Sequence, residues 1–262
     1  MSASKQNHAR RFSGLVKLYG EQGFKTLTQS HVVIIGVGGV GSWTVESLAR
    51  SGIGQLTLID LDHLSESNIN RHLPALDSTL GVSKVQTLQS RISEINARCK
   101  VHCIEDFIKR DNIGALLGAA LKGSKPALVI DCIDHAPIKA ALVVWCKQHS
   151  MPLITVGGAG ACINPLRIKV ADLAQTENDL LLSHTRKILR QKHGYPRNLK
   201  RKFAVKAVFS DEPRIKNNGL DAQAETNDSS LNCAGYGSVV HVTASFGFVA
   251  ASKAIDSLIK LK

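Results

Sequence analysis

Hydrophobic and polar positions along this chain form short apolar runs that alternate with longer amphipathic segments. Short runs rich in Val, Ile and Leu predict buried strands at residues 32–36, 55–62, 100–106, 126–134 and 151–160. Apolar residues at helical spacing predict helices at residues 12–27, 42–51, 84–97 and 137–149. This alternation predicts an α/β fold: a doubly wound, Rossmann-like, mainly parallel sheet with helices on both faces.

The pattern changes beyond about residue 165. A basic helical stretch is expected at 180–202, a strand-like run at 202–210, a polar and mobile loop at 216–230 and a closing helix at 238–260. We therefore expect residues 1–165 to form the main domain. Residues 166–262 are expected to form a C-terminal part of the same fold, with a basic extension.

Residues 229–252 contain no Lys, Arg, Asp or Glu, and this stretch is long enough to cross a membrane. Polar side chains such as Asn232, Tyr236, His241 and Thr243 would make it a poor surface for lipid. We interpret it as a helix buried against the sheet or in a subunit interface.

The cysteines and the first residues indicate a cytoplasmic protein. The six cysteines are scattered without a CxxC pair, which argues against a four-cysteine zinc site and against a disulfide framework. The first residues have no apolar core, so no secretory signal is expected. Cys233 lies in a Gly- and Ser-rich setting and is the one cysteine to consider as a nucleophile, although a structural or incidental role is favoured.

The net charge of +12 favours a polyanionic partner over mere solubility. Between Leu180 and Ser210 there are nine Lys and Arg and no acid, whereas a solvated helix face normally mixes both signs. Backbone phosphates would relieve the repulsion, so we predict nucleic-acid binding by this segment. The candidate contacts are Arg186, Lys187, Arg190, Lys192, Arg197, Lys200, Arg201 and Lys202.

The first strand runs into a glycine cluster, "VVIIGVGGVG" at 32–41, which suits a tight turn before a helix whose amides face a phosphate. Gly36, Gly38 and Gly41 match the dinucleotide fingerprint, which alone leaves NAD, FAD and ATP open. Asp60 ends the second strand, where an acid would hold a ribose in an NAD or an ATP site. Asp62, Asp131 to Asp134 and Gly157–Gly160 are expected along the same edge of the sheet.

Polar residues after the second strand favour ATP. Asn68, Arg71 and Lys84 would supply an amide and two cations. A site that holds a triphosphate and stabilises leaving diphosphate needs cations, whereas helix amides suffice for the diphosphate of NAD.

Four pieces of the chain, "GVGGVGSW", "LIDLDHLSESNINR", "GVSK" and "VIDCIDH", resemble the adenylating domain of the ubiquitin-activating-enzyme superfamily, the MoeB and ThiF fold. The resemblance covers about residues 8–165 and implies an ATP-binding adenylating domain in residues 1–165. It implies these contacts: Gly38, Gly39 and Gly41 with the nucleotide, Asp60 with the ribose, Asn68, Arg71 and Lys84 with phosphates, and Asp134 with magnesium.

Other pieces, among them "RFSGLVKLYG", "DLAQTENDLLL" and "TASFGFVAAS", resemble the family of bacterial tRNA threonylcarbamoyladenosine dehydratases nearly end to end. Activators of sulfur-carrier proteins usually carry two CxxC pairs, which this chain lacks. Their "RxxRQ" motif is "RFSG" here, so only Arg11 is kept.

The resemblance implies ATP-dependent dehydration of threonylcarbamoyladenosine, the tRNA nucleoside next to the anticodon. The threonyl carboxylate would attack the α-phosphate to give an acyl-adenylate, and an internal nucleophile would then close a ring and expel AMP. High effective concentration favours such closure without an enzyme thiol. The implied catalytic residues are Arg71, Lys84, Asp134 and Arg11.

The superfamily also implies a homodimer, with Arg11 reaching the phosphates of the partner, and leaves a sulfur-transfer protein open as a further partner. Two alternatives remain. One is an activator of the C-terminus of a small sulfur-carrier or ubiquitin-like protein. The other is an NAD-linked Rossmann protein.

Overall fold

The computed structural model describes residues 3–123, 127–198, 200–213 and 237–260. Its strands are β1 (His31–Ile35), β2 (Gln55–Ile59), β3 (Lys100–Ile104), β4 (Ala127–Asp131), β5 (Leu153–Val156), β6 (Ile168–Asp172) and β7 (Lys206–Ser210). Its longer helices are α1 (Ala3–Gln29), α2 (Gly41–Arg50), α3 (Lys84–Ile95), α4 (Ile113–Leu121), α5 (Ala136–Gln148), α6 (Leu180–Lys192) and α7 (Val240–Ile259).

The strands form one sheet in the order β3-β2-β1-β4-β5-β7-β6, in which the described strands pair in parallel except β6, which runs antiparallel to β7. The predicted doubly wound, mainly parallel α/β fold is confirmed. Because β1 pairs with β2 on one side and β4 on the other, the winding reverses at β1, and ligands of such sheets bind beyond the carboxyl ends at that point.

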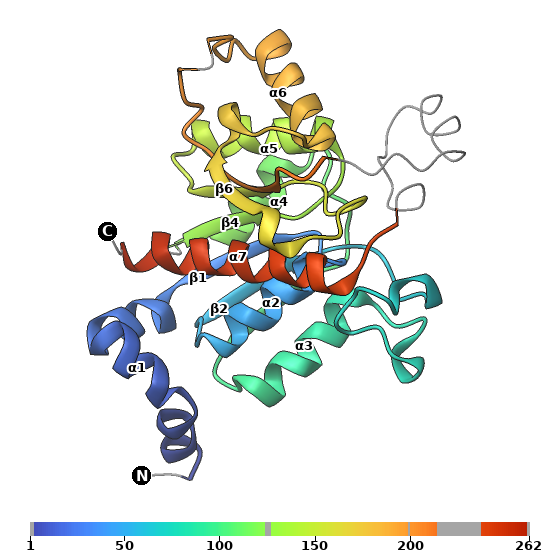
Figure 1. The fold of residues 1–262 in the computed structure, drawn as a ribbon. Helices are drawn as coiled ribbons and strands as arrows, with labels where there is room; N and C mark the ends of the chain where they lie inside the picture. The colour runs from blue at the N-terminus through green and yellow to red at the C-terminus, as the bar shows by residue number, and fades with distance from the viewer. Residues whose placement is uncertain (1–2, 124–126, 199, 214–236, 261–262) are drawn as a thin grey trace.

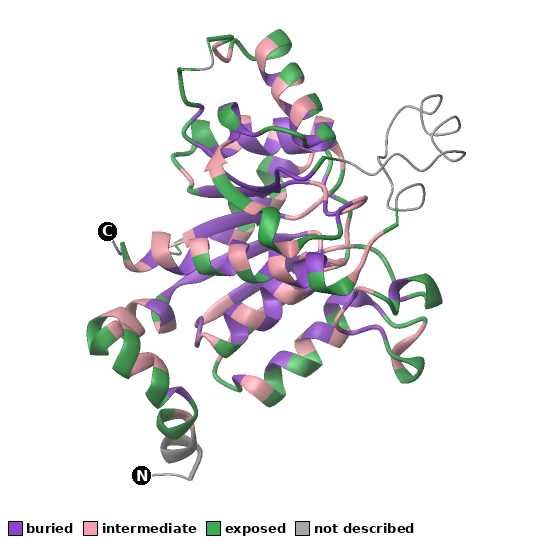
Figure 2. Ribbon diagram, in the orientation of Figure 1, coloured by how far each residue is buried: buried purple, intermediate pink, exposed green. Residues whose placement is uncertain are grey.

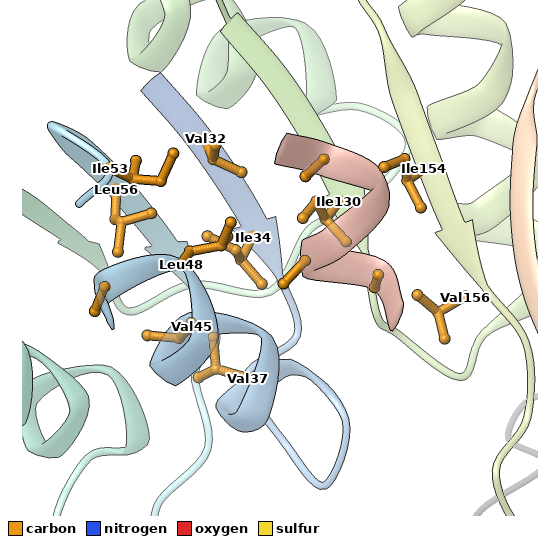
Figure 3. Packing of buried hydrophobic residues seen from close by; sticks show 14 of the residues in the cluster. Val32, Ile34, Val37, Val45, Leu48, Ile53, Leu56, Ile130, Ile154 and Val156 are labelled. Atoms are coloured by element: carbon orange, nitrogen blue, oxygen red, sulfur yellow. The ribbon is translucent and has the colours of Figure 1, made fainter. Parts of the chain in front are cut away.

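Alternate residues of β1 belong to two hydrophobic cores, one on each face of the sheet. Val32 and Ile34 pack with residues of α2, α3 and α7, whereas Val33 and Ile35 pack with α4, α5 and α6. Figure 3 shows part of the first core, where Val45 and Leu48 of α2 lie over β1 and β2. The continuous apolar runs of the sequence therefore reflect strands covered on both faces.

Helix α7 lies across one face of the sheet (Figure 1), and its sheet-facing side is buried (Figure 2). It is the one described helix long and apolar enough to cross a membrane, and 56% of its apolar window is buried inside the fold. Gly247 allows close contact with α2, because a Cβ there would lie 2.7 Å from Val40 O. The interpretation as a buried helix holds for the described part of the uncharged stretch.

Four elements differ from the sequence prediction. Helix α4 and the edge strand β6 were not predicted, and the basic helix ends at Lys192 rather than continuing to 202. The N-terminal helix α1 begins at Ala3, earlier than the predicted start at residue 12. It is interrupted at Gly20, where φ is +72°. The expected loop at 216–230 and Cys233 lie outside the described residues.

Candidate active site

The turn after β1 can be built only with glycine at two positions. Gly36 has a φ of +80°, and a Cβ there would lie 3.0 Å from Ile133 Cγ2, on the segment after β4. A Cβ at Gly41 would lie 1.9 Å from Gly36 O. The turn therefore folds back on itself and brings the N-terminus of α2 to the carboxyl end of β1.

A cavity of about 710 Å³ opens beyond the carboxyl ends of β1, β2, β4 and β5, which is within the usual range for small-molecule sites. The predicted nucleotide residues that line it are Gly36, Gly38, Gly39, Asp60, Asp62, Asn68, Arg71, Lys84 and Asp134. Gly41 lies beneath the turn and Arg11 lies elsewhere, so neither lines the cavity.

Asp60 fastens the glycine turn to the end of β2. Its Oδ2 accepts a hydrogen bond from Val37 N at 2.8 Å, and its Oδ1 accepts one from Asp62 N at 2.9 Å. Burial raises the pKa of Asp60, and the nearby Lys84 ammonium partly offsets this effect. The carboxylate is thus held in one place on the cavity wall.

The cationic side of the cavity comes from the irregular segment after β2 and from the start of α3. Lys84 is buried, and its Nζ lies 2.8 Å from Asp62 Oδ2. Arg71 Nη1 donates to Ser67 O at 2.7 Å and to Asn70 Oδ1 at 3.0 Å. Asn68 is buried and its Oδ1 accepts from Ser65 N at 3.2 Å, which fixes the 3-10 helix Glu66–Asn68 that positions Arg71.

Two aspartates, one at the end of β4 and one just after it, have opposite surroundings. Asp131 is fully buried, and its Oδ2 lies 2.9 Å from Lys139 Nζ and accepts from Thr155 Oγ1 at 2.8 Å. Asp134, three residues later, is exposed and lines the cavity. Asp131 therefore serves the fold, and Asp134 is free to meet a ligand.

A second glycine loop, Gly157–Gly160, follows β5 and lines the opposite part of the cavity. Asp179 holds it: its Oδ2 accepts from Gly158 N at 2.9 Å, and its Oδ1 caps α6 by accepting from Leu182 N at 2.9 Å. One carboxylate thus ties the start of the basic helix to the cavity wall.

Several residues of the cavity were not predicted from the sequence. His72, the loop Asp106–Lys109, Leu181, Ser238 and Thr243 line it as well. The loop follows β3, so the rule that placed Asp60 at the carboxyl end of its strand could have identified it. Nothing in the sequence pattern marks His72 apart from its place beside Arg71.

Arg11 lies on α1 beside the C-terminal end of α3, whereas the cavity residue Lys84 begins α3. Its Nη1 donates to Glu94 O at 2.9 Å and to Ile95 O at 3.1 Å, at the C-terminal end of α3, where cations are favoured. Within this chain Arg11 caps a helix and does not reach the candidate site.

The basic segment divides into two groups. Arg186 donates to Thr176 Oγ1, and Arg190 donates to Pro196 O and lies over the ring of Phe203, so these two side chains are half-buried. The other six candidates are exposed: Lys187, Lys192, Arg197, Lys200, Arg201 and Lys202. These six residues form the cationic surface: Lys187 lies within α6, Lys192 ends the helix, and the other four follow it, while the buried side of α6 packs into the core on the sheet (Figure 1).

The residues of the cavity fit ATP. Two glycine positions without space for a Cβ bring backbone amides to the cavity, and Lys84 and Arg71 supply charge opposite to phosphate. In the described part of the chain no cluster of three or more His, Cys, Asp or Glu could hold a metal. Mg²⁺ is commonly held by one or two carboxylates together with phosphate oxygens and water, and the exposed Asp134 fits such a site.

Comparison with known proteins agrees with this geometry. Residues 10–262 match the model of the ThiF family. The chain is 42% identical over 257 residues to the tRNA threonylcarbamoyladenosine dehydratase of Haemophilus influenzae, covering 98% of this chain and 96% of the relative. It is 39% identical to the enzyme of the same name from Escherichia coli, covering 95% and 93%.

A solved structure is also similar. The crystal structure of the Escherichia coli tRNA N6-threonylcarbamoyladenosine dehydratase in complex with ATP aligns with a TM-score of 0.85 and 38% identity, covering 96% of this chain and 95% of that one. The same protein has been solved in complex with AMP, with a TM-score of 0.84.

Proposed function

Because this chain belongs to the ThiF family, we propose that it is an ATP-dependent tRNA threonylcarbamoyladenosine dehydratase. The observation that carries this proposal is the convergence of the glycine turn, Asp60, Arg71 and Lys84 on one cavity. The near-complete match to dehydratases favours this reaction over the activation of a small sulfur-carrier or ubiquitin-like protein.

The reaction has two steps. The threonyl carboxylate oxygen attacks the α-phosphorus of ATP, the bond to the bridging oxygen breaks, and diphosphate leaves. An internal nucleophile of the same side chain then attacks the acyl carbon, a ring closes, and AMP leaves, so that the nucleoside has lost one water. This chain holds ATP by the glycine turn and Asp60, while Arg71 and Lys84 stabilise the charge that develops on the leaving diphosphate.

Mg²⁺ belongs to this proposal, with Asp134 as its protein ligand. A bound Mg²⁺ would neutralise phosphate charge and orient the leaving group. The exposure of Asp134 at the cavity supports this assignment, as does the structural role of its neighbour Asp131.

The tRNA would bind along the exposed cations of the segment 180–210. In this assignment residues 1–165 carry the adenylating site, and residues 166–262 complete the fold and hold the tRNA. Leu181, Ser238 and Thr243 belong to residues 166–262 and line the cavity, so the substrate would contact residues of both parts of the chain.

Further partners are also proposed. A homodimer would cover the exposed Val240 and Phe248 of α7 and bring Arg11 toward the phosphates of the second subunit. A sulfur-transfer protein is proposed as an additional partner. Since the substrate is tRNA, the expected place of action is the cytoplasm.

The test of the proposed function is diphosphate release from ATP by the purified chain. Release is expected only when tRNA carrying threonylcarbamoyladenosine is added, with tRNA that lacks the modification as the control. Release that instead required a small sulfur-carrier protein would replace this proposal by the alternative.

A further inference from the structure

His72 is a buried imidazole in the wall of the candidate site, and the proposed reaction does not use it. Only 7% of the residue is exposed, yet it lines the cavity. Its Cε1–Nε2 edge faces the glycine turn, because a Cβ at Gly38 would lie 3.4 Å from Cε1 and 3.6 Å from Nε2. The ring therefore stands against the backbone that surrounds the phosphate end of the cavity.

The hydrogen bonds of His72 indicate which nitrogen carries the proton. Nδ1 is buried and has no hydrogen-bond partner among the described residues. A buried N–H without an acceptor is less well tolerated than an unpaired acceptor. The tautomer with its proton on Nε2 is therefore favoured, and this N–H lies on the edge of the ring beside Gly38.

The charge state follows from the surroundings. Burial lowers the pKa of His72 to about 3, and the Lys84 and Arg71 cations lower it further than the Asp62 carboxylate raises it. At neutral pH the ring is thus an uncharged donor near the Lys84 and Arg71 side chains.

We propose that His72 Nε2 donates a hydrogen bond to a phosphate oxygen of the bound nucleotide. A phosphate is the expected acceptor because the donor lies beside the glycine turn and lines the same cavity as the Arg71 and Lys84 cations. The bond would orient the phosphate chain without adding a third positive charge. This inference rests on the proposed function, since it assumes that the cavity holds ATP.

The test compares the full-length chain with His72→Leu and His72→Gln, using ATP and adenosine as ligands in equilibrium binding. The leucine variant is expected to bind ATP about tenfold or more weakly, because it lacks a donor to a charged acceptor. The glutamine variant should bind ATP within about threefold of the parent chain, because its amide N–H replaces the donor. Adenosine, which has no phosphate, should bind all three proteins equally. His102→Leu, at an exposed position on β3, is the matched control.

Three outcomes would overturn the inference: equal ATP affinity in the leucine variant, an equal loss of adenosine affinity, or no rescue by glutamine in a folded variant. Thermal unfolding of each variant separates loss of the donor from loss of the fold. If the parent chain itself failed to bind ATP, the proposed function would fail rather than the assignment of His72.

Discussion

Asp131 and Asp134 show how three residues of spacing separate a structural acid from a candidate metal ligand. Both follow or end β4, but Asp131 is enclosed with Lys139 and Thr155, whereas Asp134 faces the cavity. Asp134→Asn should leave the unfolding free energy nearly unchanged and abolish most adenylation, because it removes a charged ligand from a site full of phosphate. Diphosphate release and urea unfolding measure the two effects.

Asp131→Asn is the matched comparison. It leaves the buried Lys139 ammonium without its charged partner, which typically costs about 3–5 kcal/mol of stability. If Asp131→Asn proved stable and inactive while Asp134→Asn remained active, the two assignments would be exchanged.

A second residue-scale prediction concerns acid stability. His31 is buried in β1, its Nε2 lies 2.9 Å from Thr57 Oγ1, and burial together with His102 lowers its pKa from 6.5 to about 4. Between pH 4 and pH 6.5, His31 is therefore protonated in the unfolded chain and neutral in the folded chain. The contribution of His31 is therefore fully present above pH 6.5 and is lost as the pH falls toward 4, by at most about 1.4 kcal/mol per pH unit.

The measurement is the unfolding free energy of the parent chain and of His31→Gln between pH 4 and 7. The slope against pH should be smaller in the variant, and His149→Gln, at an exposed position, is the comparison variant. An unchanged slope in His31→Gln would show that His31 titrates alike in both states.

At this scale the sequence identified the glycine turn and several of the charged residues that line the cavity, and their roles stay predictions. Asp60 was assigned because it ends the second strand, and Arg71 and Lys84 because a site for a triphosphate needs cations; all three line one cavity. His72 could not be found, because its role depends on burial and on an unpaired nitrogen. The cap that Arg11 places on α3 was likewise invisible, since it joins positions more than eighty residues apart.

At the scale of elements, Asp179 joins the basic helix to the cavity wall. It caps α6 at Leu182 N and holds Gly158 N, and a Cβ at Gly157 would lie 1.9 Å from its Oδ2. Asp179→Ala should lower the unfolding free energy by about 1–2 kcal/mol, the usual cost of a lost helix cap. It should also raise the apparent KM for tRNA, because the start of α6 and the loop Gly157–Gly160 would no longer be held together.

Asn164→Ala is the control for this prediction, because Asn164 caps the short 3-10 helix Pro165–Arg167 and does not line the cavity. Amide hydrogen exchange should increase at Gly158 and Leu182 in Asp179→Ala alone. An unchanged exchange rate at Gly158 would show that Asp179 does not hold the loop Gly157–Gly160.

Elements buried on both faces were predicted well, and elements at the margins were not. The strands β1, β2 and β4 read as continuous apolar runs because helices cover both of their faces. The edge strand β6 has no fully buried residue and includes Lys169 and Asp172, so its sequence resembles a loop. Helix α7 was identified as buried because its polar side chains made a lipid-facing role unattractive.

At the scale of the whole molecule, Arg11 provides a test of the proposed dimer. If each site borrows Arg11 from the second subunit, mixing Arg11→Ala with Lys84→Ala subunits should restore some activity, since one site of each mixed dimer has both residues. Diphosphate release before and after subunit exchange measures this. No recovery, with exchange verified by mass, would confine Arg11 to the capping of α3 described above.

Helix α6 separates the proposed tRNA-binding surface from the cavity where ATP would react. Helix α6 has 13 residues and is therefore about 20 Å long; Leu181 at its start lines the cavity, and the exposed cations lie toward and beyond its far end. A tRNA held at that far end could place one nucleoside in the cavity while its backbone stays on the cationic surface. Such binding is largely independent of sequence and strongly dependent on salt, because each phosphate contact releases counterions.

Replacing Arg197, Lys200, Arg201 and Lys202 together by Ala should weaken tRNA binding by at least about tenfold and flatten its dependence on salt. ATP binding should survive, since none of the four lines the cavity. A charge-matched control replaces four exposed cations elsewhere: Lys17 and Lys25 on α1, Arg98 before β3, and Lys100 at the start of β3. If both quadruple variants kept the parent affinity and salt slope, the segment 180–210 would not be the tRNA-binding surface, and a protein substrate would become the better explanation of its charge.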